Sequence, residues 1–160
     1  MPKSKQRKKH YTPRASGNAA ALSSFPVTAA MVNSLKNDMR SMLLRLRMSG
    51  VNGKDLAALV ACFGQAWILA NAMADGAELQ SHIEEGVKNL SEAIAQDSKT
   101  AVDKVYDSLL DLIELTVQIV SLSSRGEYKS ASDKLKVPGK VAFVDEFFLT
   151  LAKAQLLQVV

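Results

Sequence analysis

The longest run of apolar side chains lies between Leu56 and Ala74, where only Gly64, Gln65 and Asn71 interrupt it. A helix that is apolar on all sides must be surrounded by protein or by lipid. Its large side chains have the spacing of one helix face: Leu56, Leu59, Val60, Phe63 and Trp67. Its small residues recur every fourth position on another side, where a neighbouring helix can approach closely. The pattern predicts a central helix over residues 56–74.

A first helix is predicted ahead of this run, from Thr28 to Ser49. Thr28 is a suitable N-cap, and Pro26 precedes the helix as prolines often do near helix starts. Gly50 and the pair Asn52-Gly53 predict a short turn after it. The inner stripe has helical spacing: Met31 or Val32, Leu35, Met39, Met42 and Leu46.

Three further helices are predicted after the central one, at residues 77–96, 100–123 and 141–157. The stretch 124–140 contains Gly126, Pro138 and Gly139 and is predicted to be irregular, apart from a helical turn at 132–135. No segment alternates apolar and polar residues, so a sheet is not expected. We therefore expect an all-α fold of about five helices in a mostly antiparallel bundle around the central helix.

Length and composition fit one folded domain, since 160 residues with 48% apolar content suffice for a sizeable core. The single Cys62 excludes an intramolecular disulfide, which suits a reducing compartment. No apolar segment follows the basic start, so we expect no secretory signal and a cytoplasmic protein. A membrane span at 56–74 is the alternative, but its many alanines give a weak transfer signal, and we expect no membrane association.

The net charge of +4 is distributed unevenly along the chain. Residues 1–50 contain ten basic side chains and one acidic one, whereas residues 51–160 contain ten basic and fifteen acidic ones. Residues 1–24 combine this charge with prolines, serines and few large apolar residues, so we expect a disordered arm when free. Residues 25–160 are predicted to form the helical domain.

The arm holds six basic side chains within twelve residues, beside His10 and Tyr11, which can stack on bases. They are Lys3, Lys5, Arg7, Lys8, Lys9 and Arg14. Phosphate backbones attract such segments through counterion release. In composition, though not in any family motif, the arm resembles the starts of ribosome-associated, nucleoid-associated, phage and plasmid proteins. A solubilising or targeting tail is the alternative.

Two charged surfaces are predicted on the helices. Lys36, Arg40 and Arg47 project from one side of the first helix, with Arg45 nearby, and either extend the positive surface of the arm or form a solvated face. A carboxylate ridge occurs at spacings of four, four and three residues: Asp103, Asp107, Asp111 and Glu114. The ridge is either a solvated face or a docking surface for a basic partner, including the arm.

The sequence offers few carriers of catalysis. Cys62 lies among apolar residues without a base in view, and His82 borders an apolar stripe. There is neither a phosphate-binding glycine loop nor a Glu-x-x-His pair for a bundle metal site. We therefore expect no enzyme, cofactor or metal. The leading hypothesis is a non-enzymatic protein whose arm and first helix contact phosphates of DNA or RNA with little sequence specificity, while its bundle self-associates or docks a protein partner. The alternative is a small protein-interaction or regulatory factor, such as a phage or plasmid accessory protein acting on a host complex.

Overall fold

The computed structural model of the protein describes residues 24–157. These residues form seven α-helices and no β-strand, which confirms the all-α prediction for this part of the chain. The helices are α3 (Ala29–Met48), α4 (Gly53–Ala70), α5 (Gly76–Gln96), α6 (Ala101–Lys104), α7 (Tyr106–Ser121), α8 (Arg125–Leu135) and α9 (Ala142–Lys153). Nearly all of the predicted basic arm, residues 1–23, lies outside the described residues.

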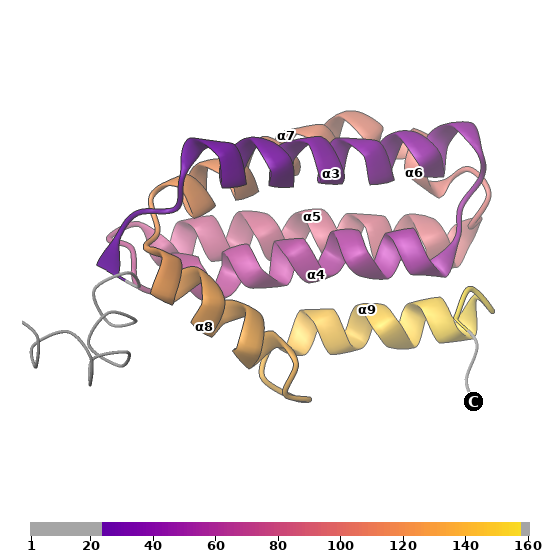
Figure 1. Cartoon of the computed structure of the whole chain (residues 1–160). Coiled ribbons are helices and arrows are strands. Elements are labelled where there is room, and N and C mark those ends of the chain that lie inside the picture. The colour runs from indigo at the N-terminus through magenta and orange to yellow at the C-terminus, as the bar shows by residue number, and fades with distance from the viewer. Residues whose placement is uncertain (1–23, 158–160) are drawn as a thin grey trace, which may run out of the picture.

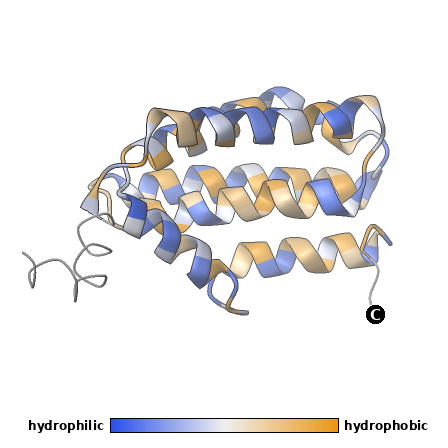
Figure 2. Cartoon of the chain, viewed as in Figure 1, coloured by the Kyte–Doolittle hydropathy of each residue, from blue (hydrophilic) through white to orange (hydrophobic). Residues whose placement is uncertain are grey.

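Helix α4 lies in the middle of the helices and contacts α3, α5, α7, α8 and α9. Figure 1 shows α3 and α7 along one side, α4 and α5 between, and α8 and α9 along the other side. In Figure 2, α4 and α9 are mostly hydrophobic, whereas α8 is mostly hydrophilic. Leu56, Leu59, Val60 and Phe63 of α4 are fully buried. In length and composition α4 also meets the requirement for a membrane span, as core helices of soluble proteins do.

The central helix ends earlier than the predicted residue 74. Asn71 caps α4, and residues 71–75 form successive turns in which Met73 N donates to Ala70 O at 2.9 Å and Gly76 N donates to Met73 O at 3.0 Å. A Cβ atom at Gly76 would lie 2.1 Å from Ala70 O, so this tight reversal requires glycine. The apolar run therefore continues through a turn that its composition does not reveal.

The predicted helix at 100–123 is two helices, because the chain departs from helical geometry at Val105, with φ −113° and ψ 17°. The stretch 124–140 was predicted to be irregular, and that is wrong for its first part, where α8 forms. Ser124 accepts from Glu127 N at 3.1 Å, and the Glu127 carboxylate accepts from Ser124 N at 2.8 Å. This capping box satisfies two backbone donors at the start of α8. With seven helices described, the predicted count of about five is not confirmed.

The first and last helices differ in how well the sequence predicts their ends. The Thr28 hydroxyl accepts from Met31 N at 3.2 Å, so the predicted N-cap of α3 is confirmed. Helix α9 ends at Lys153 and not at 157, because Gln155 adopts a left-handed conformation with φ 60°. Leu156 N then donates to Leu151 O at 2.9 Å, which completes a Schellman motif.

Candidate functional site

The basic residues of α3 lie against the acidic residues of α7. Lys36 Nζ lies 3.4 Å from a carboxylate oxygen of Glu114, and the Arg40 guanidinium donates to the same carboxylate. Both helices pack together along their length, so these contacts join residues more than seventy positions apart in the sequence. Two of the three cations predicted to extend the arm's positive surface are therefore paired with one carboxylate.

The third of these cations, Arg47, has two neighbours. Its Nε lies 3.7 Å from Asp103 of α6, and its guanidinium lies 4.3 Å from the centre of the Tyr106 ring. A guanidinium at this distance is attracted by the negative face of the ring. Arg45 donates two hydrogen bonds to Asp55, at 3.0 and 3.2 Å. All four basic side chains of α3 thus have a carboxylate partner.

The contact between Arg45 and Asp55 shifts the pKa of both side chains. The hydrogen bonds from Arg45 are the main reason that the pKa of Asp55 is lowered, and a further hydrogen bond from Asn52 acts in the same direction. The same pair raises the pKa of Arg45. Asn52 is also the N-cap of α4 and accepts from Asp55 N at 2.8 Å. This bidentate contact therefore joins the end of α3 to the start of α4.

The predicted acidic ridge is divided between α6 and α7. Its two ends, Asp103 and Glu114, pair with cations of α3, as described above. Asp107 and Asp111 are exposed and form no ion pair with any residue in 24–157. The ion pairs of Glu114 and Asp103 with α3 are solvent-exposed, and each contributes a few tenths of a kcal/mol up to about 1 kcal/mol to the stability of the fold. The ridge thus has a basic partner within the fold, and docking of the arm on it stays a hypothesis.

The predicted nucleic-acid contacts of the arm lie outside the described residues. They are Lys3, Lys5, Arg7, Lys8, Lys9, His10, Tyr11 and Arg14. The described chain begins at the end of the molecule where α8 starts, since Pro26 forms a β-bridge with Ser124. The arm is therefore attached beside α8.

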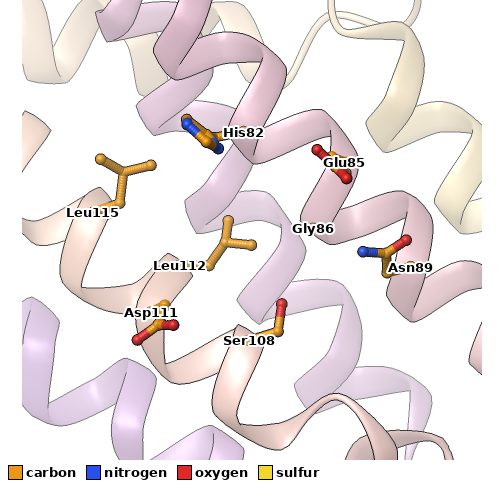
Figure 3. Close-up of a pocket in the computed structure, with 8 residues that line it drawn as sticks. All are labelled: His82, Glu85, Gly86, Asn89, Ser108, Asp111, Leu112 and Leu115. Atoms are coloured by element: carbon orange, nitrogen blue, oxygen red, sulfur yellow. The ribbon is translucent and has the colours of Figure 1, made fainter.

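A groove of about 420 Å³ lies between α5 and α7 (Figure 3). Five polar side chains line it: His82, Glu85 and Asn89 from α5, and Ser108 and Asp111 from α7. In Figure 3, Leu112 projects from α7 towards Gly86 of α5. A Cβ atom at Gly86 would lie 1.8 Å from the Leu112 side chain, so the glycine allows the two helices to approach at this point.

The polar groups of the groove do not form a catalytic arrangement within the described part of the chain. A nucleophile needs a base within hydrogen-bond reach. None of His82, Glu85, Asn89, Ser108 and Asp111 hydrogen-bonds another described side chain. The described residues also contain no group of three His, Cys, Asp or Glu side chains suited to a metal ion. The prediction that the protein is not an enzyme stays a prediction.

Cys62 is a packing residue in this fold and not an activated thiol. It packs against the hydrophobic core from α4. Burial raises the pKa of Cys62 to about 11, with a smaller contribution from Asp38. Since the thiolate is the reactive form, this side chain is a weak nucleophile at neutral pH.

One group of charged residues was not predicted from the sequence, namely the basic residues of the segment 124–140. The pattern predicts an irregular segment apart from a helical turn at 132–135, so the sequence places its lysines on no common surface. Ser124 and Glu127 have the spacing of a capping box, and this signal predicts a helix start at Arg125.

Three comparisons with known proteins complete the description of the site. No protein-family model matches the chain, and no curated protein or solved structure matches it significantly. The charges and contacts of this chain are therefore the basis on which its function can be inferred.

Proposed function

We propose that the protein is a non-enzymatic nucleic-acid-associated protein whose basic arm contacts backbone phosphates. The observation that carries this proposal is the charge of the arm. Residues 1–23 contain six basic side chains and no acidic one. All four basic residues of α3, in contrast, have carboxylate partners. The arm is thus the largest concentration of positive charge without acidic residues in its own segment.

The chemistry of the arm favours contact with phosphates and little reading of base sequence. Lysine and arginine release condensed counterions when they neutralise phosphates, and this gives affinity without sequence information. His10 and Tyr11 offer rings for stacking on exposed bases, which is tolerant of sequence. DNA and RNA are both suitable partners on these grounds.

We further propose that residues 25–160 form one mostly antiparallel bundle around α4. The connections after α3 and α4 span only residues 49–52 and 71–75, and short connections favour antiparallel neighbours. In this arrangement α6 and α7 act as one interrupted helix, and α8 covers one end of α4. The bundle presents surfaces for self-association or for a protein partner.

A second candidate is a small protein-interaction or regulatory factor, for example a phage or plasmid accessory protein acting on a host complex. Leu44 and Met48 favour it, because their exposed fractions are 52% and 76% and they lie four residues apart on α3. Residues at this spacing share one side of a helix. In this reading the arm has an auxiliary role.

An electrophoretic mobility assay with the full chain and a variant lacking residues 1–14 tests the leading proposal. If all six basic side chains contact phosphates of duplex DNA, log affinity falls with log salt at a slope near −5, from about 0.9 per phosphate. The truncated chain loses the part of this dependence that comes from the arm. A variant with residues 3–14 in scrambled order is the matched control, and it retains binding because the charge is unchanged.

The proposal fails if the full chain binds neither DNA nor RNA at low ionic strength. It also fails in its present form if the scrambled arm loses binding, because the contact would then depend on sequence and not on charge. In the first case the interaction factor becomes the leading candidate.

A further inference from the structure

A second basic surface lies on α8 and the turn that follows it. Residues 124–140 contain five basic side chains and two acidic ones, whereas the rest of residues 51–160 is acidic overall. The basic residues are Arg125, Lys129, Lys134, Lys136 and Lys140. The positive charge of the folded part is therefore concentrated in two places, α3 and this segment.

The lysines of α8 point into solvent, while its apolar residues hold the helix on α4. Lys129 and Lys136 have side-chain exposures of 81% and 77%. Ala131 is buried, and Leu135 packs so closely on Gly64 that a Cβ atom there would lie 2.8 Å from Leu135 Cδ1. Gln65 of α4 donates to Tyr128 O at 3.0 Å. The segment is thus held against α4 by packing and a hydrogen bond, while its lysines are exposed to solvent.

Few carboxylates oppose these charges. Asp133 lies between Lys129 and Lys136 at N–O distances of 3.8 and 4.0 Å, which is the outer limit of an ion pair, and all three side chains are exposed. Such pairs contribute little and are readily exchanged for another anion. Arg125, Lys134 and Lys140 have no carboxylate partner among residues 24–157, and residues 1–23 contain no acidic side chain.

The geometry around Lys129 and Lys134 suits a phosphate group. The two lysines flank a shallow depression of about 400 Å³, whose other lining residues are Gly126, Ser130, Asp133 and Val137. Gly126 lacks a side chain, and Ser130 provides a hydroxyl donor four residues later on the same side of the helix. An anion in the depression would lie near the ammonium groups of both lysines and the hydroxyl of Ser130. Asp133 is the one carboxylate among the lining residues.

The arm is attached next to this surface. Val27 N donates to Ser123 O at 3.1 Å, and Arg125 N donates to Phe25 O at 2.8 Å, so the start of the described chain is fixed to the start of α8. Figure 1 places both at the same end of the molecule. The Arg125 guanidinium lies 5.8 Å from the centre of the Phe25 ring, which is a further contact between the start of the described chain and α8.

We propose that α8 and its following turn bind phosphates of the same nucleic-acid backbone that the arm contacts, with Lys129 and Lys134 as the central contacts. This inference rests on the proposed function and names the folded part of the binding surface. The depression lies on the helix whose start is bonded to Phe25 and Val27, the first residues after the arm. We leave helix α3 outside this surface because each of its cations has a carboxylate partner on another helix, whereas Lys134 has none among residues 24–157.

The test compares salt-dependent binding of a fluorescent DNA duplex by the full chain and two double variants. Lys129→Gln/Lys134→Gln removes the proposed contacts. Lys88→Gln/Lys99→Gln is the matched control, since it removes the same charge from exposed sites outside α3 and the segment 124–140. If both lysines of α8 contact phosphates, the slope becomes shallower by about two, and affinity at 0.1 M salt falls about eightfold for each lost contact. The control keeps the wild-type slope.

The outcomes separate this inference from the proposed function. If the wild type binds DNA and both double variants bind it as tightly as the wild type does, the proposed binding surface on α8 is ruled out. The proposed function of the arm is then unaffected. If the wild type binds neither DNA nor RNA, the proposed function fails and the inference fails with it. Lysine-dependent binding to phosphatidylserine vesicles without nucleic-acid binding also overturns it, because the surface would then be one for membranes. Circular dichroism of each variant confirms that the helices are retained.

Discussion

Helices α3 and α8 both carry several basic side chains, but only those of α3 are matched by carboxylates across a helix interface. On α3, Lys36 and Arg40 share Glu114, and Arg47 lies against Asp103 and Tyr106. On α8, Asp133 is the one carboxylate near the lysines, at distances close to the limit of pairing. The two helices therefore leave different numbers of cations without a carboxylate partner, although α3 carries four basic side chains and α8 carries three.

The difference follows from where each helix packs. Helix α3 contributes Met39, Leu43 and Leu46 to the core and lies along α7, so its polar border meets the polar border of α7. Helix α8 buries only Ala131 and crosses the end of α4, which has no acidic face there. Cations beside an acidic helix support the fold, whereas cations at the edge of the fold remain free to bind.

The largest expected effect concerns how much α3 and α8 each contribute to the hydrophobic core. Leu43→Ala on α3 removes a fully buried side chain and should lower the free energy of unfolding by about 2–5 kcal/mol. Leu135→Ala on α8 removes a partly buried side chain and should cost less. Urea unfolding of both variants measures the difference. Equal losses would mean that α8 is as much a part of the core as α3.

The second-largest effect concerns the cations of α3 that are paired with Glu114. Glu114→Gln removes the partner of Lys36 and Arg40, so nucleic-acid affinity at low salt should rise a few-fold while stability falls by less than about 1 kcal/mol. Asp111→Asn is the matched control, because it removes the same charge from a site without an ion pair. An equal rise in both variants would indicate a general charge effect and not the release of α3.

A smaller effect concerns pH and the Arg45–Asp55 contact. Hydrogen bonds from Arg45 lower the pKa of Asp55 in the folded protein, so this contact stabilises the fold above the ordinary pKa of about 4. Its contribution is lost as pH falls through the lowered pKa. Urea midpoints between pH 7 and pH 3 should therefore decrease less in Asp55→Asn than in the wild type. Parallel curves for the two proteins would rule out this contribution.

The smallest effect is expected at Asp107, which is exposed and has no ion pair within the described residues. Asp107→Asn should change the free energy of unfolding by no more than a few tenths of a kcal/mol. Thermal unfolding measures it. A loss above 1 kcal/mol would indicate a partner for Asp107 that the contacts on α7 do not include.

The fold was more predictable than the site because apolar periodicity is a local signal. It located α3, α4 and α5 and the buried Phe63, and the residue type of Thr28 predicted the N-cap of α3. It did not reveal the turn after Ala70, because that reversal depends on contacts around Gly76 and not on a polar break. The glycines and the proline of 124–140 predict an irregular stretch with one helical turn at 132–135, although the capping box that starts α8 is visible in the sequence.

The pairing of α3 with the carboxylate ridge could not be predicted, since it depends on which helices become neighbours. Glu114 and Arg40 are far apart in the sequence, and each looks like part of a solvated face when its own helix is read alone. Charge patterns on single helices identify candidate surfaces. Only the packing determines which of those surfaces stay unpaired.

The central claim is that the arm and α8 provide the available positive charge while α3 does not. Titration of the isotope-labelled full chain with a short DNA duplex at low salt, followed by two-dimensional NMR, tests this residue by residue. We predict shift changes in residues 3–14 and in 125–140, with little change between Lys36 and Arg47. Changes centred on α3, or no change anywhere at low salt, would contradict the account.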